Sequence, residues 1–138
     1  MKTRKEELQH LLKQFQQNID VLAALNKSII IKNSDGYFKV GLHEIICCES
    51  HNSSVTYFLT DKRKLFASVS LKQCEQILQH NNFFRVHQKH IVNLQHVINY
   101  KPDKDGGELT LIENNKVKVA RMRKEDFIHR LYASSING

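Results

Sequence analysis

The stretch from Phe83 to Val97, FFRVHQKHIVNLQHV, interleaves apolar side chains with basic and amide side chains. The apolar members are expected in a core, which leaves the arginine, lysine, histidine, glutamine and asparagine side chains for a polar or anionic partner. Guanidinium and ammonium groups bind phosphate oxygens, and amide or guanidinium groups can also pair with base edges. This stretch therefore favours recognition of an anion or a nucleic acid.

Metal binding and catalysis are the alternatives for the same residues. His87 and His90 lie three residues apart, a spacing that would suit a metal ion on a helix. However, Gln88 and Lys89 lie between them, and neither a carboxylate nor a cysteine flanks them. The chain has no glycine-rich phosphate loop, no serine elbow and no HExxH motif. A general-base role for His43, His51 or His87 is the alternative, but no pair of nucleophile and acid accompanies them. We expect a binding protein without a metal or other cofactor, and not an enzyme.

Positive charge is concentrated in the second half of the 138-residue chain, whose formal net charge is +7. From Arg85 to Lys124, nine lysines and arginines oppose four acidic residues, a surplus of five. Two basic clusters, RVHQKH and KVKVARMRK, are expected at strand ends, where side chains project from the rim of a sheet and can straddle a phosphate backbone. A solvated basic rim without a partner is the alternative.

Residues 1–26 are expected to form a separate amphipathic helix. Their apolar side chains recur at spacings of four and three, which places them on one seam: Leu8, Leu12, Phe15, Ile19 and Leu22. The seam could pack onto the chain's own domain, or it could pair two copies in a short coiled coil. With fewer than three heptads, such a dimer would be marginal alone.

Residues 27–138 are expected to form one mostly β domain of small antiparallel sheets with one short helix in the middle. The expected strands are 29–32, 37–40, HEIICCES, VTYFLT, KLFASV, 83–86, VINYK, ELTLI and KVKVA. Turns are expected at Asp35-Gly36 and Gly106-Gly107. Ser70 can cap the short helix, and RKEDFIHRLYA is expected to close the chain as a helix.

The cysteine content and the distribution of apolar residues indicate the cellular compartment. Cys47, Cys48 and Cys74 are three cysteines without a CxxC pair, which favours buried thiols in a reducing compartment. The first residues lack the apolar run of a signal peptide, and no apolar stretch approaches the ~20 residues that a membrane span needs. We expect a soluble, cytoplasmic protein without a membrane partner.

Four segments, in the same order, resemble the LytTR family of bacterial DNA-binding domains. FFRVHQKHIVNLQHV resembles the family's F-x-R-x-H-R-S-Y-I-V-N signature, and VGLHEIICCES resembles its L-x-D-I-x-Y-x-E-A strand. SVSLKQCEQIL resembles its S-L-x-x-L-E-x-x-L helix, and VKVARMRKEDF resembles its closing I-P-V-S-R-R-K-x-x-F. The resemblance covers roughly residues 29–131.

The resemblance implies an elongated β fold whose loops and strand ends enter successive major grooves of double-stranded DNA. Such domains regulate transcription from repeated promoter half-sites, as dimers or paired copies. Three stretches would carry the DNA contacts. They are the loop of His51, Asn52, Ser53 and Ser54; the signature residues Arg85, His87, Gln88 and Lys89; and the basic end of Arg121, Arg123 and Lys124.

The sequence departs from the family's pattern at several of these positions. Gln88 replaces an arginine, Lys89 a serine and His90 a tyrosine, while Ala120 replaces a serine and Met122 the second arginine. A glutamine that reaches a base pairs with adenine, whereas arginine favours guanine. The binding mode is therefore expected to carry over better than the base preference.

Members of the family are usually attached to a phosphorylated receiver domain, for which this chain has no room. We expect either a receiver-less regulator or the C-terminal fragment of a response regulator in a two-component, histidine-kinase pathway, with the first helix as linker or dimerisation element. The rival functions are a protein-interaction module of the same fold and a non-specific nucleic-acid binder. His87 and Asn93 could also serve structure rather than contact.

Overall fold

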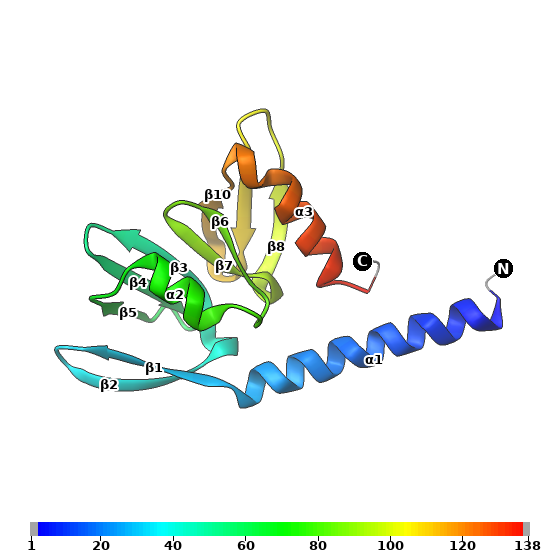
Figure 1. Cartoon of the computed structure of the whole chain (residues 1–138), viewed down its shortest axis with the longest axis horizontal. Helices are drawn as coiled ribbons and strands as arrows, with labels where there is room; N and C mark the ends of the chain where they lie inside the picture. Colours follow the sequence, from blue (N-terminus) through cyan, green and yellow to red (C-terminus); the bar gives the residue numbers. More distant parts are fainter. Residues whose placement is uncertain (1–2, 137–138) are drawn as a thin grey trace.

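The computed structural model describes residues 3–136, apart from the side chains of residues 20–26. A long helix, α1 (Arg4–Asn26), precedes three antiparallel sheets (Figure 1). The first sheet is a ribbon of β1 (Ser28–Asn33) and β2 (Gly36–Gly41).

The second sheet has five strands and the third has three. In spatial order the second contains β5 (Lys64–Ala67), β4 (Ser54–Leu59), β3 (Ile45–His51), β7 (His90–Asn93) and β6 (Phe83–His87). The third contains β10 (Asn115–Lys118), β9 (Glu108–Leu111) and β8 (Val97–Lys101). Two shorter helices complete the fold, α2 (Leu71–Leu78) between β5 and β6 and α3 (Lys124–Ala133) at the end.

The prediction of a mostly β domain with small antiparallel sheets behind an N-terminal helix is confirmed. The short helix predicted in the middle of the domain is α2, and the closing helix predicted from RKEDFIHRLYA is α3. Within residues 3–136 the structure adds four 3-10 turns that were not predicted, three of them between strands and the fourth just before α3. These turns are Leu42–Glu44, Leu94–His96, Ile112–Asn114 and Arg121–Arg123. The sequence patterns also do not resolve β7, whose four residues follow β6 after a two-residue turn.

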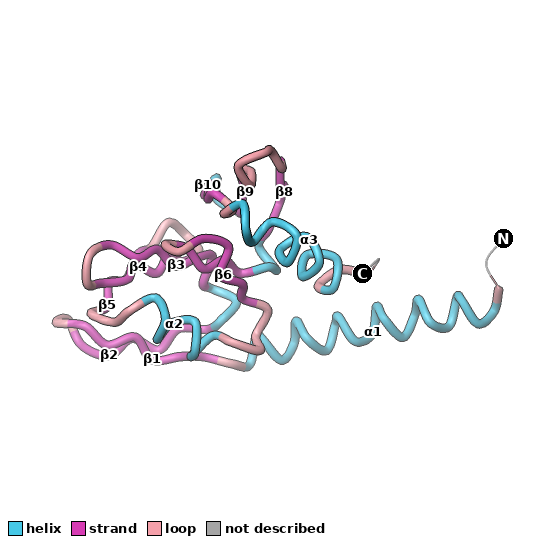
Figure 2. Tube along the Cα trace, turned by 45° about the horizontal axis from the view of Figure 1, so that its top comes forward, coloured by secondary structure: helices cyan, strands magenta, loops and turns pink. Residues whose placement is uncertain are grey.

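The five-stranded sheet lies in the middle of three layers, as Figure 2 shows. Its first face packs on α2 and the β1–β2 ribbon, and its second face packs on α3 and the three-stranded sheet. Consequently β3 is buried on both faces: Cys48 faces the first core and Cys47 the second. A bulge between Ile45 and Cys47 breaks the alternation, so Ile46 and Cys47 face the same core. The three cysteines are buried and free.

The helix α1 projects away from the sheets in Figure 1. Its start is capped reciprocally: the Glu6 amide donates to the Thr3 hydroxyl (3.1 Å), and the Thr3 amide donates to the Glu6 carboxylate (3.4 Å). The described seam residues, Leu8, Leu12, Phe15 and Ile19, are exposed, and so is Leu11 beside them. The predicted seam residue Leu22 lies outside the described side chains. No helix within residues 3–136 is long and apolar enough to cross a membrane.

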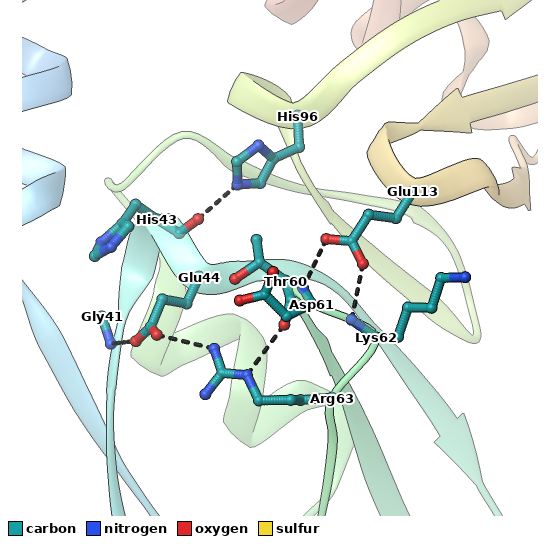
Figure 3. Close-up of polar contacts among 9 residues, drawn as sticks. All are labelled: Gly41, His43, Glu44, Thr60, Asp61, Lys62, Arg63, His96 and Glu113. Carbon is teal, nitrogen blue, oxygen red and sulfur yellow. Dashed lines mark hydrogen bonds and ion pairs between the residues drawn. The ribbon is translucent and has the colours of Figure 1, made fainter.

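Ion pairs and hydrogen bonds fix the sheets against one another at the end shown in Figure 3. Glu113 follows β9 in a left-handed conformation, with φ of 57°. Its two carboxylate oxygens accept the backbone N–H groups of Asp61 and Lys62, each at 2.8 Å. These two residues form the β4–β5 turn, so one side chain joins the three-stranded sheet to the five-stranded sheet.

A second set of contacts in Figure 3 joins the 3-10 turn before β3 to its neighbours. The Glu44 carboxylate accepts the Gly41 amide at 2.8 Å and pairs with the Arg63 guanidinium at 2.9 Å. The Gly41 amide and the Arg63 side chain hold the pKa of Glu44 below its usual range. His96 Nε2 lies 2.7 Å from the His43 carbonyl oxygen, which brings the start of the three-stranded sheet to the same turn.

Candidate nucleic-acid interface

The first predicted contact stretch forms the tip of the β3–β4 hairpin. Asn52 and Ser53 are its two turn residues, and Asn52 has a φ of 54°, a conformation that asparagine tolerates better than most residues. The Ser54 hydroxyl donates to the His51 carbonyl at 3.0 Å and closes the turn. Because His51, Asn52 and Ser53 are exposed, the tip presents an imidazole, an amide and a hydroxyl to solvent.

The second stretch is the two-residue turn between β6 and β7. The side chains of Gln88 and Lys89 are exposed and have no partner within residues 3–136. The Lys89 amide donates to His87 Nδ1 at 3.2 Å, so His87 stabilises the turn from inside. The Lys89 carbonyl accepts the Ser50 amide at 2.8 Å. That bond joins this turn to the base of the first hairpin tip.

Arg85 supports the second stretch and is itself only partly accessible. Its side chain is 20 % exposed, its Nη2 donates to the Gln88 carbonyl at 2.7 Å, and its Nη1 lies 3.4 Å from the Glu75 carboxylate. Its Nε is buried and has no hydrogen-bond partner in the part of the chain that the structure describes. This geometry suits Arg85 for positioning the turn.

The third stretch is the 3-10 turn Arg121–Arg123, which lies beside β6. The Ala120 amide donates to the Val86 carbonyl at 2.8 Å, and Arg123 Nη1 donates to the Arg85 carbonyl at 3.3 Å. One backbone bond and one side-chain bond thus bring the C-terminal basic cluster to β6, more than thirty positions earlier in the chain.

The basic side chains of the third stretch differ in what they contact. Arg121 is exposed and has no partner among the described residues. Lys124 is half-buried, and its Nζ donates to the Asp103 carbonyl at 3.2 Å. Met122, which stands where the family has a second arginine, is 95 % exposed. Arg121 is therefore the side chain of this stretch that is most free to meet a partner.

The three stretches lie toward the upper left of the molecule in Figure 1, and hydrogen bonds link each to the next. The bond from Ser50 to Lys89 joins the first to the second, and the bonds of Val86 and Arg85 join the second to the third. We call this surface the basic rim: residues 51–54, 85–89 and 121–124.

A polar groove of about 400 Å³ runs beside the first two stretches of the basic rim. Besides rim residues it is lined by Ser68, Lys72 and Gln73, near the start of α2. The sequence analysis did not place these three residues beside the predicted contact stretches. The Ser70 cap could have indicated them, because it marks the start of a helix, and the backbone amide groups of a first helical turn favour anions.

His90 and Glu49 lie opposite each other on β7 and β3, just inside the basic rim. His90 Nε2 is 3.8 Å from the Glu49 carboxylate, and its Nδ1 is buried without a partner within residues 3–136. Burial lowers the pKa of His90, with smaller effects from Glu49, which opposes the shift, and from His87 and Lys89, which reinforce it.

Asn93 has a structural role, which was one of two considered for it, the other being contact with DNA. It is 3 % exposed, and its amide nitrogen donates to the Ile45 carbonyl at 2.9 Å. Its side-chain oxygen accepts the Gln95 amide at 3.0 Å and begins the 3-10 turn after β7. Among residues 3–136, no group of three or more histidine, cysteine or acidic side chains is arranged to hold a metal ion.

An exposed rim of basic and amide side chains, carried on the turns of a central antiparallel sheet, is typical of a nucleic-acid-binding β domain. The LytTr DNA-binding domain family matches residues 35–131, and the chain belongs to this family. A solved structure described as the LytTr DNA-binding domain of a methyl-accepting/DNA response regulator from Bacillus cereus has the same fold. The TM-score is 0.67 at 22 % identity, over 75 % of this chain and 95 % of that one. The comparison with curated proteins found no match.

Proposed function

We propose that this protein is a sequence-specific transcription regulator that binds repeated promoter half-sites through the major groove of DNA. The observation that carries the proposal is the basic rim, in which three stretches distant in sequence are joined by two backbone hydrogen bonds and one from the Arg123 side chain. Cations on such a rim bind phosphates, and exposed amide or guanidinium groups between them read base edges.

The contacts of the rim residues suggest a division of roles. The side chains of Gln88, Lys89 and Arg121 have no partner within the described chain and are proposed to contact bases or phosphates directly. The hairpin tip His51–Ser54 is proposed to enter the groove beside them. Arg85 and Arg123 hold backbone carbonyls and act chiefly as positioning residues that also supply positive charge.

The proposal is tested by selecting bound fragments from the source genome and measuring fluorescence anisotropy on the best fragment and on a scrambled version. Specific binding should exceed scrambled binding by about a thousandfold or more and should weaken steeply with salt. Equal affinity for both DNAs would show a non-specific nucleic-acid binder. No binding to either would remove the function.

Further parts of the proposal concern the context of the domain. We propose that residues 27–138 form the DNA-binding unit and that residues 1–26 link it to a signalling partner or pair two copies. A bacterial two-component pathway and a cytoplasmic location, where chromosomal DNA is accessible, belong to the same proposal.

A protein-interaction module is the second candidate function, because α1 exposes an apolar seam that could dock a different protein. Phe15, at the middle of the seam, is 63 % exposed. The anisotropy assay with selected and scrambled DNA distinguishes the two functions. A chain that recognises a fragment specifically is a regulator, whether or not α1 also docks a partner.

A further inference from the structure

A second pocket, distinct from the groove beside the basic rim, lies over β6 between α2 and α3. Its volume is about 280 Å³. Figure 1 shows α2 and α3 on either side of β6. Arg85 lines both this pocket and the rim groove.

The walls of this pocket carry more positive than negative charge. Arg85, Arg123 and Arg130 contribute three guanidinium groups, and Glu75 contributes one carboxylate. The floor is apolar and partly aromatic. It consists of Leu78, Phe83, Phe84 and Ile91.

The guanidinium groups keep unused capacity for an anion. Arg85 Nε is buried and has no hydrogen-bond partner among residues 3–136, a costly arrangement for a charged donor. Arg130 lies over the ring of Phe84, 5.5 Å from its centroid, and Arg123 donates to a backbone carbonyl, so neither is neutralised by a carboxylate of the described chain. Glu75 reaches Arg85 only through Nη1, at 3.4 Å.

We propose that this pocket binds a small organic carboxylate that carries an apolar body. A carboxylate matches the donor geometry of a guanidinium group, and the body would cover the floor of Phe83 and Phe84. The size is adequate, because an apolar cavity of about 150 Å³ already holds benzene. An aromatic acid or a short-chain fatty acid fits this chemistry.

Occupation of the pocket would be felt at the basic rim, a step that rests on the proposed function. Arg85 Nη2 holds the Gln88 carbonyl, and Arg123 belongs to the third stretch of the rim. A bound carboxylate adds negative charge beside a surface that meets phosphates and competes for these two arginines. Carboxylate binding therefore opposes DNA binding, and the coupling is reciprocal.

The pocket is tested on the full chain by calorimetry with benzoate as the probe, at constant ionic strength. Benzamide retains the body without the charge, and inorganic phosphate retains charge without the body. We expect both to bind at least tenfold more weakly than benzoate, with benzoate-induced amide NMR shifts in α2, β6 and α3. Phosphate binding as tightly as benzoate would make the pocket a phosphate subsite and overturn the proposal. Absent benzoate binding, or shifts elsewhere, would also overturn it.

A matched pair of variants locates the anion. Arg130→Gln should weaken benzoate binding about tenfold, whereas Lys39→Gln, which removes an exposed cation on β2, should leave it unchanged. Thermal unfolding checks that both variants fold, and Arg123→Gln replaces Arg130→Gln if the latter does not. Unchanged affinity in the pocket variant, or equal loss in both, contradicts the assignment.

The coupling between carboxylate binding and DNA binding is measured separately, by the anisotropy of labelled DNA with and without saturating benzoate. We expect benzoate to weaken DNA binding severalfold in the wild type and less in Arg130→Gln. Unchanged DNA affinity overturns the coupling. If the chain binds no DNA, the proposed function and the coupling both fail, and calorimetry alone decides the pocket.

Discussion

Arg121 and Arg85 are opposite cases among the cations of the basic rim. Arg121 is exposed without a partner in the described chain, whereas Arg85 is 20 % exposed and contacts both Gln88 and Glu75. A free guanidinium loses only its hydration when DNA arrives, but a bonded one must first give up contacts. The direct contacts are therefore expected from the free side chains.

Replacing Arg121 tests this distinction. Arg121→Ala should weaken binding to the selected fragment by about 1–3 kcal/mol, the value of a bidentate base contact, and should reduce discrimination against scrambled DNA. Fluorescence anisotropy measures both effects. Lys39→Ala on β2 removes an equal charge away from the rim and serves as the control. An Arg121→Ala protein with unaltered affinity would exclude Arg121 from the interface.

His90 gives a prediction about stability and pH. Because burial lowers the pKa of His90 below the ordinary histidine value of about 6.5, the unfolded chain binds this proton more readily than the folded chain does. The free energy of unfolding should thus fall as pH drops below about 6.5 and level off below the folded pKa. Denaturant titrations at several pH values measure this, and His90→Gln should remove the His90 part of the slope. A slope that the substitution leaves unaltered would contradict the assignment.

For individual residues, the sequence identifies which side chains carry charge but not which residues each of them contacts. The interleaving of apolar and polar residues in the signature predicts that Gln88 and Lys89 are exposed. The tie between Arg85 and Glu75 depends on how α2 packs on β6, which no local pattern specifies. The contact of Arg123 with the Arg85 carbonyl has the same origin.

At the scale of elements, two glycine turns share a positive φ but differ in the room that a Cβ atom would have. Gly106 has a φ of 123°, and a Cβ there would lie 1.9 Å from the Val119 carbonyl oxygen. Gly36 has a φ of 126°, yet a Cβ there would meet nothing within 4 Å. Gly36→Ala therefore carries conformational strain alone, whereas Gly106→Ala carries strain and a backbone collision.

Alanine at these two positions makes a matched comparison. Gly36→Ala should reduce the free energy of unfolding by about 1–3 kcal/mol, and Gly106→Ala should reduce it by clearly more. Urea denaturation followed by circular dichroism measures both. Because the Gly106 loop abuts the backbone just before Arg121, DNA binding should suffer in Gly106→Ala and persist in Gly36→Ala. Equal destabilisation of the two would refute the close approach.

The Glu113 contact gives a second comparison between elements. Glu113→Ala removes two hydrogen bonds to the β4–β5 turn and should cost about 1–2 kcal/mol. Glu108→Ala removes an exposed ion pair with Lys116 and should cost about 0.5 kcal/mol or less. Denaturant midpoints of the two variants measure the difference. An equal loss of stability in both would show that the Glu113 contact contributes no more than a surface ion pair.

Most elements were predictable because their signals are local. The Ser70 cap and the Asp35-Gly36 turn mark a helix and a hairpin directly. The 3-10 turns and β7 were not, since they are three or four residues long and hold their conformation through contacts such as the Asn93 amide with the Ile45 carbonyl. The order of strands in the central sheet likewise depends on pairings between distant segments.

At the scale of the whole molecule, the described residues of the α1 seam are exposed, and we propose that the seam pairs two copies of the chain. The positions flanking the seam, such as Gln9, Gln16 and Asn18, are uncharged, so two copies would meet without repulsion. Burial of exposed leucine and phenylalanine side chains would supply the free energy.

Light scattering across a range of protein concentrations tests the pairing. The wild-type chain should show a concentration-dependent dimer, and Phe15→Glu, which places a charge in the seam, should stay monomeric. Gln14→Glu changes charge on the outer face and is the control. A wild type that stays monomeric at the highest concentration would rule out pairing through α1.

The connection between α1 and the β domain has a mechanical consequence. A single residue, Lys27, separates the end of α1 at Asn26 from the start of β1 at Ser28. Each residue of a helix advances about 1.5 Å and turns about 100°. One residue inserted into α1 would swing its seam to another side of the molecule, while seven would return it to nearly the same azimuth about 10 Å farther out. The phase of α1, more than its length, would then set how two bound copies face each other along a promoter.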